Sequence, residues 1–391
     1  MKPVRVVGAG LSGLAAAWYL AKLGAEVEIL EASSRAGGLI GTRRESHGLV
    51  ETAANALLWT DDVRDLFAEL AVEPQFPRPE SRRRYIVRNG VPRRWPLSPI
   101  ETAATAARFA SRWASGALAP RESESVAAWG RRTLGAAATE HVLGPALQGI
   151  YAAPSDQLSA EAIGLGRRKP RPGLAAPMGG MEALIDGLQA ALLRRGVRIA
   201  FGARLDRIDR DRPTMICTSA PEAERLAGSA GLEPLATALR AVRMLPLVTA
   251  TAFFEPAPGD VHGFGVLFPR HSARALGVLL NTDTFEHRGP ARSETWIYGG
   301  GDALGEDHAV LRSAIERDRR VNRIGSGALV ALHVTRVAAA LPLYDGAIAG
   351  VRQACAALPA WLGLCGNYTG AIGASALITR ARHEADRVVS A

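Results

Sequence analysis

Three glycines near the start of the chain have the spacing of a phosphate-binding turn. Gly8, Gly10 and Gly13 form the pattern Gly-x-Gly-x-x-Gly. The first glycine makes a tight turn, the second lets the backbone approach a pyrophosphate, and the third allows a helix to pack closely on a strand. The N–H groups at the start of that helix, which include Leu11 and Ser12, attract phosphate charge. The spacing predicts a dinucleotide-binding turn, with a glycine turn of an unrelated α/β fold as the alternative.

An acidic residue follows at the position that such a site requires. Glu31 lies eighteen residues after Gly13, at the end of an apolar run. A carboxylate at this point accepts hydrogen bonds from an adenosine ribose with a free 2′-hydroxyl. The residue therefore favours FAD or NAD over NADP as the ligand.

The elements that must position these residues surround them in the sequence. Val4–Val7 is a short β-rich run, residues 14–23 have helical character, and residues 25–30 form a second apolar run. Strand, glycine turn, helix and strand make a βαβ unit of the length that a dinucleotide fold needs.

The rest of the chain alternates between helical and strand-like stretches. We predict helices at 61–70, 98–166 and 181–195, and a hairpin at 85–96 around Asn89 and Gly90. Strand-like runs follow at 197–201, 214–218, 248–254, 265–269, 277–281 and 295–298, and a helix pair with a glycine-rich segment ends the chain. Because the strand-rich block lies between stretches of nucleotide-fold character, we expect the dinucleotide domain to be discontinuous.

Composition narrows the partners and the compartment. The 391 residues carry a formal net charge of +9, and the lysines are Lys2, Lys22 and Lys169, so arginine supplies most of the positive charge. The basic residues are scattered without zinc-finger spacing or a basic helix with aromatics, and we expect no nucleic-acid partner. The three cysteines have neither a disulfide framework nor metal-ligand spacing, so we predict a cytoplasmic protein without a metal site. Apolar stretches are too short to span a bilayer, and we expect at most peripheral contact with the inner face of a membrane.

The residues after Glu31 identify a family resemblance. Glu31-Ala32-Ser-Ser-Arg35-Ala-Gly37-Gly38, followed by Thr42, resembles the second motif of the flavin-containing amine oxidase and protoporphyrinogen oxidase superfamily. The resemblance implies that the glutamate binds the ribose and that Ala32, the arginine and the paired glycines lie along FAD. Nothing in the sequence requires a thioether to a cysteine, so we expect FAD to be bound non-covalently.

Four later segments resemble one branch of this superfamily, in the family's order. They are 145–159, 263–278, 341–344 and 366–370, and they resemble the protoporphyrinogen and coproporphyrinogen oxidases of haem biosynthesis. The last segment resembles the one that brings the final helix to the flavin, which adds Gly366, Asn367 and Ile372 to the implied FAD residues. The resemblance extends over essentially the whole chain.

The resemblance implies a mixed α/β fold and a division into three regions. We expect a Rossmann-type, discontinuous FAD-binding domain at 1–77, 173–232 and 345–391. A sheet-containing substrate domain is expected at 78–97 and 233–344, and a helical lobe at 98–172.

The implied activity is the FAD-dependent oxidation of a porphyrinogen, with molecular oxygen as acceptor and hydrogen peroxide as product. No side chain is assigned a catalytic role, because the flavin N5 atom takes the hydride once the macrocycle is positioned. Arg84 corresponds to a family arginine that pairs with a propionate, although a solvated basic run is the alternative. The other implied substrate residues are Gly149, Tyr151, Gly265, Leu267, Leu279 and Ile297.

Other functions are left open by departures from the family pattern. Residues 53–55 replace a glycine-containing segment, the chain is short near 208–213, and a tryptophan is absent at 337–338. An FAD-dependent oxidase or desaturase of another apolar substrate and a silent homologue that binds FAD or a tetrapyrrole are the alternatives. An amine oxidase that uses a lysine near the flavin is disfavoured, because no lysine follows Lys169. The sequence does not distinguish substrates with two propionates from those with four.

Overall fold

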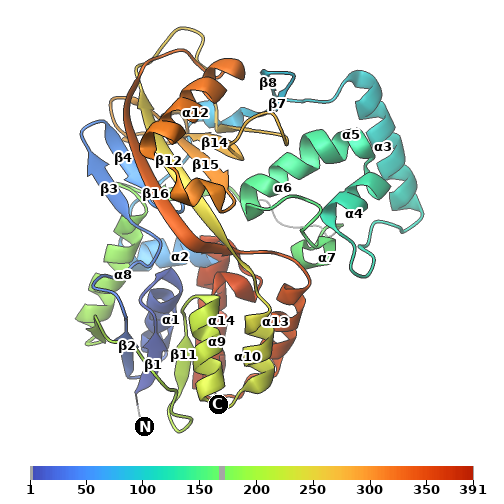
Figure 1. Cartoon of the computed structure of the whole chain (residues 1–391). Helices are drawn as coiled ribbons and strands as arrows, with labels where there is room; N and C mark the ends of the chain where they lie inside the picture. Colours follow the sequence, from blue (N-terminus) through green and yellow to red (C-terminus); the bar gives the residue numbers. More distant parts are fainter. Residues whose placement is uncertain (1–2, 167–171, 391) are drawn as a thin grey trace.

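The computed structural model describes residues 3–166 and 172–390, so Lys2 and Lys169 lie outside the described residues. The fold is a mixed α/β architecture, as predicted. Figure 1 shows an α/β layer with both chain termini at the bottom, a second sheet above it, and a helical lobe at the right.

The lower layer is a parallel sheet of the kind the βαβ unit predicts. Its strands are, in spatial order, β10 (Arg198–Ala200), β2 (Val27–Leu30), β1 (Val4–Val7), β11 (Thr214–Ile216) and β17 (Leu362–Leu364). One face packs on α1 (Leu11–Lys22), α2 (Asp61–Leu70), α8 (Glu182–Arg194) and α14 (Ala374–Val389). The other face packs on α9 (Ala220–Ser229), α10 (Glu233–Arg240) and α13 (Ala347–Ala356). Helices therefore bury both faces, which explains why its strands read as short apolar runs.

The upper sheet joins distant parts of the chain. Its spatial order is β16 (Leu329–Pro342), β12 (Met244–Phe254), β15 (Arg292–Gly299), β14 (Gly277–Leu280), β13 (Gly265–Leu267), β7 (Arg84–Arg88) and β8 (Val91–Arg93). One face packs on α12 (His308–Val321) through a core that contains Trp296 and Phe268. The opposite face is turned toward the helical lobe and the lower layer.

The structure corrects the sequence analysis in this region. It contains β16, α12 and a hairpin of β3 (Thr42–Glu45) and β4 (Gly48–Glu51), none of which was predicted. β16 carries three consecutive alanines, which disfavour strands, but it pairs with β12 along almost its whole length. Tertiary pairing has therefore overridden local propensity.

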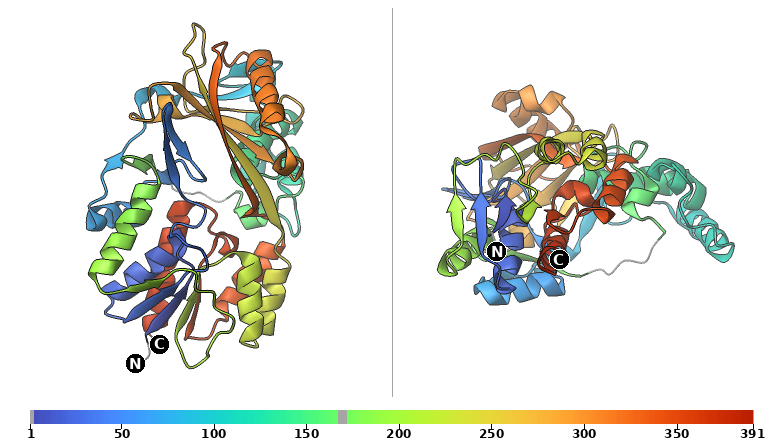
Figure 2. Two further views of the ribbon diagram at one scale, coloured as in Figure 1. Left: turned by 60° about the vertical axis from the view of Figure 1, so that its left-hand side comes forward. Right: turned by 90° about the horizontal axis from the view of Figure 1, so that it is seen from below.

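The helical lobe joins the upper sheet through its central helices. It comprises α3 (Pro99–Ala114), α4 (Val126–Thr133), α5 (Ala136–Ala138), the π-turn η2 (Thr139–Leu143), α6 (Gly144–Tyr151) and α7 (Ala160–Ile163). The π-turn packs against β7, and α6 packs against β13. Figure 2 shows α3 projecting from the body of the molecule in its right-hand view. No helix within the described residues is long and apolar enough to cross a membrane.

The short elements connect these three parts. They are β5 (Leu57–Leu58), β6 (Pro74–Gln75), β9 (Leu174–Pro177), α11 (Asn281–Thr284), η1 (Pro79–Arg82), η3 (Asp302–Gly305) and η4 (Asn367–Thr369). β5 and β6 both pair with β9, which ties residues 57–75 to the segment that precedes α8.

Candidate functional site

The glycine turn has the backbone geometry that the sequence pattern predicts. Gly8 has a φ of +100°, and a Cβ there would lie 2.6 Å from the Cys217 carbonyl oxygen. A Cβ on Gly13 would collide with the carbonyl oxygen of Gly8, so α1 can approach the turn only with glycine at this position. Gly8 and Gly13 are therefore required by the protein's own packing.

Gly10 differs, because a Cβ there would make only an ordinary van der Waals contact and no clash. Its φ of −71° suits any residue, and the nearest protein atom to a built Cβ would be the Gly38 Cα, 3.9 Å away. Gly10 is the N-cap of α1, and no side chain caps the N–H groups that begin with Leu11 and Ser12. The protein's own packing therefore does not require glycine here, and a glycine beside uncapped N–H groups suits a pyrophosphate that approaches the backbone.

Arg35 holds the loop of residues 36–40, which faces Gly10. Its guanidinium donates hydrogen bonds to the carbonyl oxygens of Gly38 at 2.8 Å and Ile40 at 3.0 Å. The Gly37 N–H donates to the Ala9 carbonyl at 2.8 Å, so the loop is tied directly to the glycine turn. The structure thus brings the two predicted motifs together and gives Arg35 a role in shaping the loop.

Glu31 lies at the end of β2, against the same turn. Its carboxylate accepts hydrogen bonds from the Ala9 N–H at 2.6 Å and the Ser33 N–H at 2.8 Å. Ala32, beside it, is exposed. The carboxylate is half-buried and fixed in position, which suits the recognition of a ribose at the turn.

The C-terminal segment reaches the same place from β17. The buried Cys365 thiol is hydrogen-bonded to Ser12 at the start of α1, and Gly366 follows it. The Asn367 side chain donates to the Ala340 carbonyl at the end of β16 at 2.9 Å, and Ile372 packs beside the helical-lobe core. Burial raises the pKa of Cys365 to about 12, so this thiol is a poor nucleophile.

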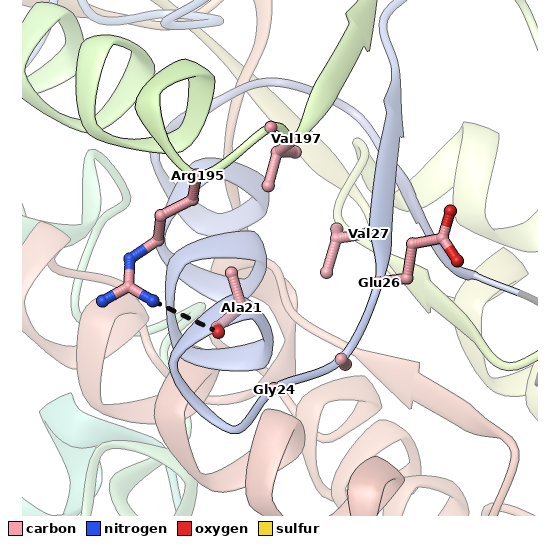
Figure 3. Close-up of a pocket in the computed structure, with 8 residues that line it drawn as sticks. Ala21, Gly24, Glu26, Val27, Arg195 and Val197 are labelled. Carbon is pink, nitrogen blue, oxygen red and sulfur yellow. Dashed lines mark hydrogen bonds between the residues drawn. The ribbon is translucent and has the colours of Figure 1, made fainter.

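All these groups occupy one edge of the lower sheet. Gly8, Glu31 and Cys365 directly follow β1, β2 and β17, whose carboxyl ends share that edge. Ligands of open parallel sheets bind at this edge. Figure 3 shows a different hollow of about 280 Å³ at the opposite edge, where Arg195 donates to the Ala21 carbonyl at 3.5 Å. That hollow lies away from the candidate site.

The predicted substrate residues of the upper sheet share one face. Arg84 pairs with Gly265, and Gly265 pairs with Leu279. Two residues further along β13, Leu267 pairs with Gly277 of β14, and Gly277 in turn pairs with Ile297 of β15. Registered neighbours point to the same side of a sheet, and so do residues two apart on one strand. These positions lie on the face opposite α12.

This face is apolar in its centre and basic at its edge. Leu267, Leu279 and Ile297 are half-buried. Arg84 is exposed, and its guanidinium lies 4.7 Å from the centre of the Phe264 ring. The arrangement suits an apolar ligand that carries an anionic group.

Three predicted substrate residues also have packing roles in the structure. A Cβ on Gly149 would lie 2.7 Å from a Leu267 methyl group, so glycine allows α6 to approach the sheet. A side chain on Gly265 would collide with the Val278 carbonyl. The Tyr151 ring lies 4.8 Å from that of Tyr344, and burial raises the pKa of Tyr151.

Two contacts that the sequence analysis did not predict connect the regions. Arg288 donates to Glu51 at 2.6 Å, and both side chains are buried, so this ion pair joins the β14–β15 connection to β4. Tyr344 donates to the Asn367 carbonyl at 3.0 Å. The proline–tyrosine resemblance pointed to Tyr344, whereas no local signal pointed to a pair 237 residues apart. No group of His, Cys, Asp and Glu suited to a metal occurs within residues 3–166 and 172–390.

The fold and the glycine-lined edge define a dinucleotide-binding protein with a second sheet over the nucleotide layer. The chain belongs to the flavin containing amine oxidoreductase family, whose profile matches residues 11–225. It is thus a flavin-dependent oxidoreductase by family.

Relatives with assigned activities match to different extents. The chain is 25% identical to protoporphyrinogen oxidase 2 of Arabidopsis thaliana, over 100% of this chain and 94% of that protein. It is 27% identical to coproporphyrinogen III oxidase of Bacillus subtilis, over 40% of this chain and 38% of that protein. A candidate protoporphyrinogen oxidase structure from Exiguobacterium sp. 255-15 superposes with a TM-score of 0.80 at 20% identity, covering 98% of both chains. The structural likeness supports the fold.

Proposed function

We propose that this protein oxidises a porphyrinogen to the porphyrin, with non-covalent FAD as cofactor and molecular oxygen as acceptor. The observation that carries the proposal is the similarity to a protoporphyrinogen oxidase along the whole chain. The apolar sheet face with Arg84 at its edge agrees with a flat, hydrophobic macrocycle that carries carboxylates.

The residues that would hold FAD are those at the carboxyl edge of the lower sheet. The backbone at Gly10 and the uncapped start of α1 would receive the pyrophosphate, and Glu31 would bind the ribose. Bound FAD would supply a hydride acceptor, and removal of six electrons from a porphyrinogen would require three two-electron transfers. Three molecules of oxygen then become three of hydrogen peroxide.

The chain's own groups position the substrate and exclude water. Leu267, Leu279 and Ile297 would contact the pyrrole faces, while Arg84 would pair with a propionate. α6 covers part of the sheet through the contact between Gly149 and Leu267, which limits access of water. Positioning of this kind can supply much of the rate enhancement without a side-chain base.

The test is steady-state oxidation by FAD-loaded protein, followed by porphyrin fluorescence and peroxide release. We expect three peroxides per porphyrin. Leu279→Asp, which puts a charge on the apolar face, should reduce turnover, whereas Arg320→Ala on the exposed side of α12 serves as a matched surface control. Because porphyrinogens oxidise slowly in air, a rate no faster than that of protein without FAD would refute the proposal.

A further inference from the structure

A cavity of about 360 Å³ lies between the helical lobe and the segment after β13. We call it the arginine pocket. Its polar lining includes Arg131, Arg270, His271, Thr139, Ser155 and Gln148. Cations, hydroxyls and an amide from α4, η2, α6 and two loops converge there, and these are groups that bind carboxylates.

The pocket begins where the predicted substrate face ends. Gln148 lines the pocket, and the next residue, Gly149, contacts Leu267 on the sheet face. Arg270 follows Leu267 by three residues along the chain. The arginine pocket and the substrate face therefore adjoin neighbouring sides of α6.

Arg84 and the pocket lie beyond opposite ends of β13. Arg84 is in register with Gly265 at the start of this strand, and Arg270 comes five residues after Gly265. β13 advances about 3.3 Å per residue and the chain turns at Arg270, so these positions are roughly 10–15 Å apart. A tetrapyrrole with carboxylates on opposite edges spans a comparable distance.

Two acids, Asp156 and Glu140, also line the pocket, but neither forms a buried ion pair with its arginines among the described residues. Arg270 lies 3.6 Å from Asp156, but the two side chains are 58% and 56% exposed, so solvent screens this pair and a ligand carboxylate can replace it. Arg131 and His271 have no ion-pair partner among the described residues. Glu140 also lines the pocket, and its charge acts on Arg88.

We infer that the arginine pocket is a second carboxylate subsite, and that the substrate carries carboxylates on both edges of its macrocycle. Arg84 binds the propionates of one edge, and Arg270 and Arg131 bind those of the other. The inference rests on the proposed function. It selects a four-carboxylate porphyrinogen, because a substrate with vinyl groups on the second edge would leave the pocket without an anion.

Kinetics with coproporphyrinogen, which has four carboxylates, and protoporphyrinogen, which has two, test the inference. Arg270→Ala should raise KM for coproporphyrinogen about 2- to 5-fold with little change in kcat, as expected for a partly exposed charge pair that binds ground and transition states alike. Arg270→Ala should leave KM for protoporphyrinogen unchanged, whereas Arg84→Ala should raise KM for both substrates. Asp156→Asn, which removes the competing acid, should lower KM for coproporphyrinogen only. Equal effects of Arg270→Ala on both substrates, or none, would overturn the inference.

Equilibrium binding separates this inference from the proposed function. Fluorescence titrations of FAD-loaded protein use coproporphyrin, its tetramethyl ester and protoporphyrin as probes. Arg270→Ala should weaken the binding of coproporphyrin only, and Arg320→Ala should not weaken the binding of any of the three probes. If neither porphyrinogen is oxidised by the wild type, the proposed function fails, while the titrations still decide whether the subsite exists. Ester binding that is equally sensitive to Arg270→Ala would show that the pocket does not recognise carboxylates.

Discussion

Gly10→Val should abolish FAD binding while the protein still folds. The residue has an extended backbone conformation, and a Cβ would have no protein atom nearer than 3.9 Å. Loss of a glycine N-cap lowers the free energy of unfolding by roughly 0.5–1 kcal/mol, and the smaller conformational entropy of the unfolded variant offsets a similar amount. We therefore expect the stability of the FAD-free protein to change by less than about 1 kcal/mol.

The cofactor should respond very differently. The valine side chain would occupy the volume through which the pyrophosphate approaches the Gly10 backbone, so the dissociation constant of FAD should rise at least about 100-fold, or roughly 2.7 kcal/mol. FAD at 100 times its dissociation constant stabilises the wild type by about 2.7 kcal/mol and should not stabilise the variant. Fluorescence titration and thermal unfolding with and without FAD measure both quantities.

Two other glycine variants complete the comparison. Gly228→Val on α9 also points into open space but lies away from the site, and it should leave FAD binding unchanged. Gly13→Ala would collide with the backbone at Gly8 and should destabilise even the FAD-free protein, by about 3 kcal/mol. Normal FAD affinity in Gly10→Val would show that the pyrophosphate does not approach the backbone at Gly10.

Three more predictions follow from the described contacts. Acid denaturation should release FAD quantitatively from the wild type and from Cys365→Ser, because the Cys365 thiol is buried. Flavin that stays attached to the wild type but not to the variant would indicate a covalent link to this cysteine. Glu28 is desolvated by burial, but hydrogen bonds from Arg5 and Arg198 and the charge of Arg212 hold its pKa below the usual value. Its carboxylate therefore contributes stability above the unfolded-state pKa and loses it as pH falls through the folded pKa. Glu28→Gln should lower the free energy of unfolding by about 1–3 kcal/mol at pH 7, a range already reduced because Arg198 is exposed. The difference in unfolding free energy between wild type and variant should become smaller in acid. Urea unfolding that gives a constant difference from pH 7 to 3 would contradict this. None of the residues of α3 is buried, Ile100 and Trp113 are 83% and 71% exposed, and the helix also carries Arg108 and Arg112. The protein should therefore float with anionic liposomes at moderate salt, and Ile100→Ser with Trp113→Ser should reduce flotation. Recovery only with detergent would instead indicate an integral protein.

The local chemistry of the nucleotide site could be predicted from the sequence. The glycine turn, α1 and Glu31 lie within one short βαβ unit, so their spacing along the chain constrains their spacing in the fold. The resemblance of later segments also identified Arg84 and Leu279 as candidates without showing how they are arranged. The first signal is short-range and the second depends on family patterns, and both kinds of signal can be read from a single sequence.

Only the tertiary structure decided how distant segments meet. The pairing of β7 with β13 places Arg84 beside Gly265, although 180 residues separate them, and a shift of one residue would turn Leu267 or Leu279 to the opposite face. The strand β16 forms despite its alanines because β12 offers a long partner, which no local window reveals. The ion pair between Glu51 and Arg288 likewise depends on how the two sheets pack. Strand register and long-range packing are properties of the whole fold, so the sequence predicted which residues form the candidate nucleotide site, and the fold decided which residues share a face.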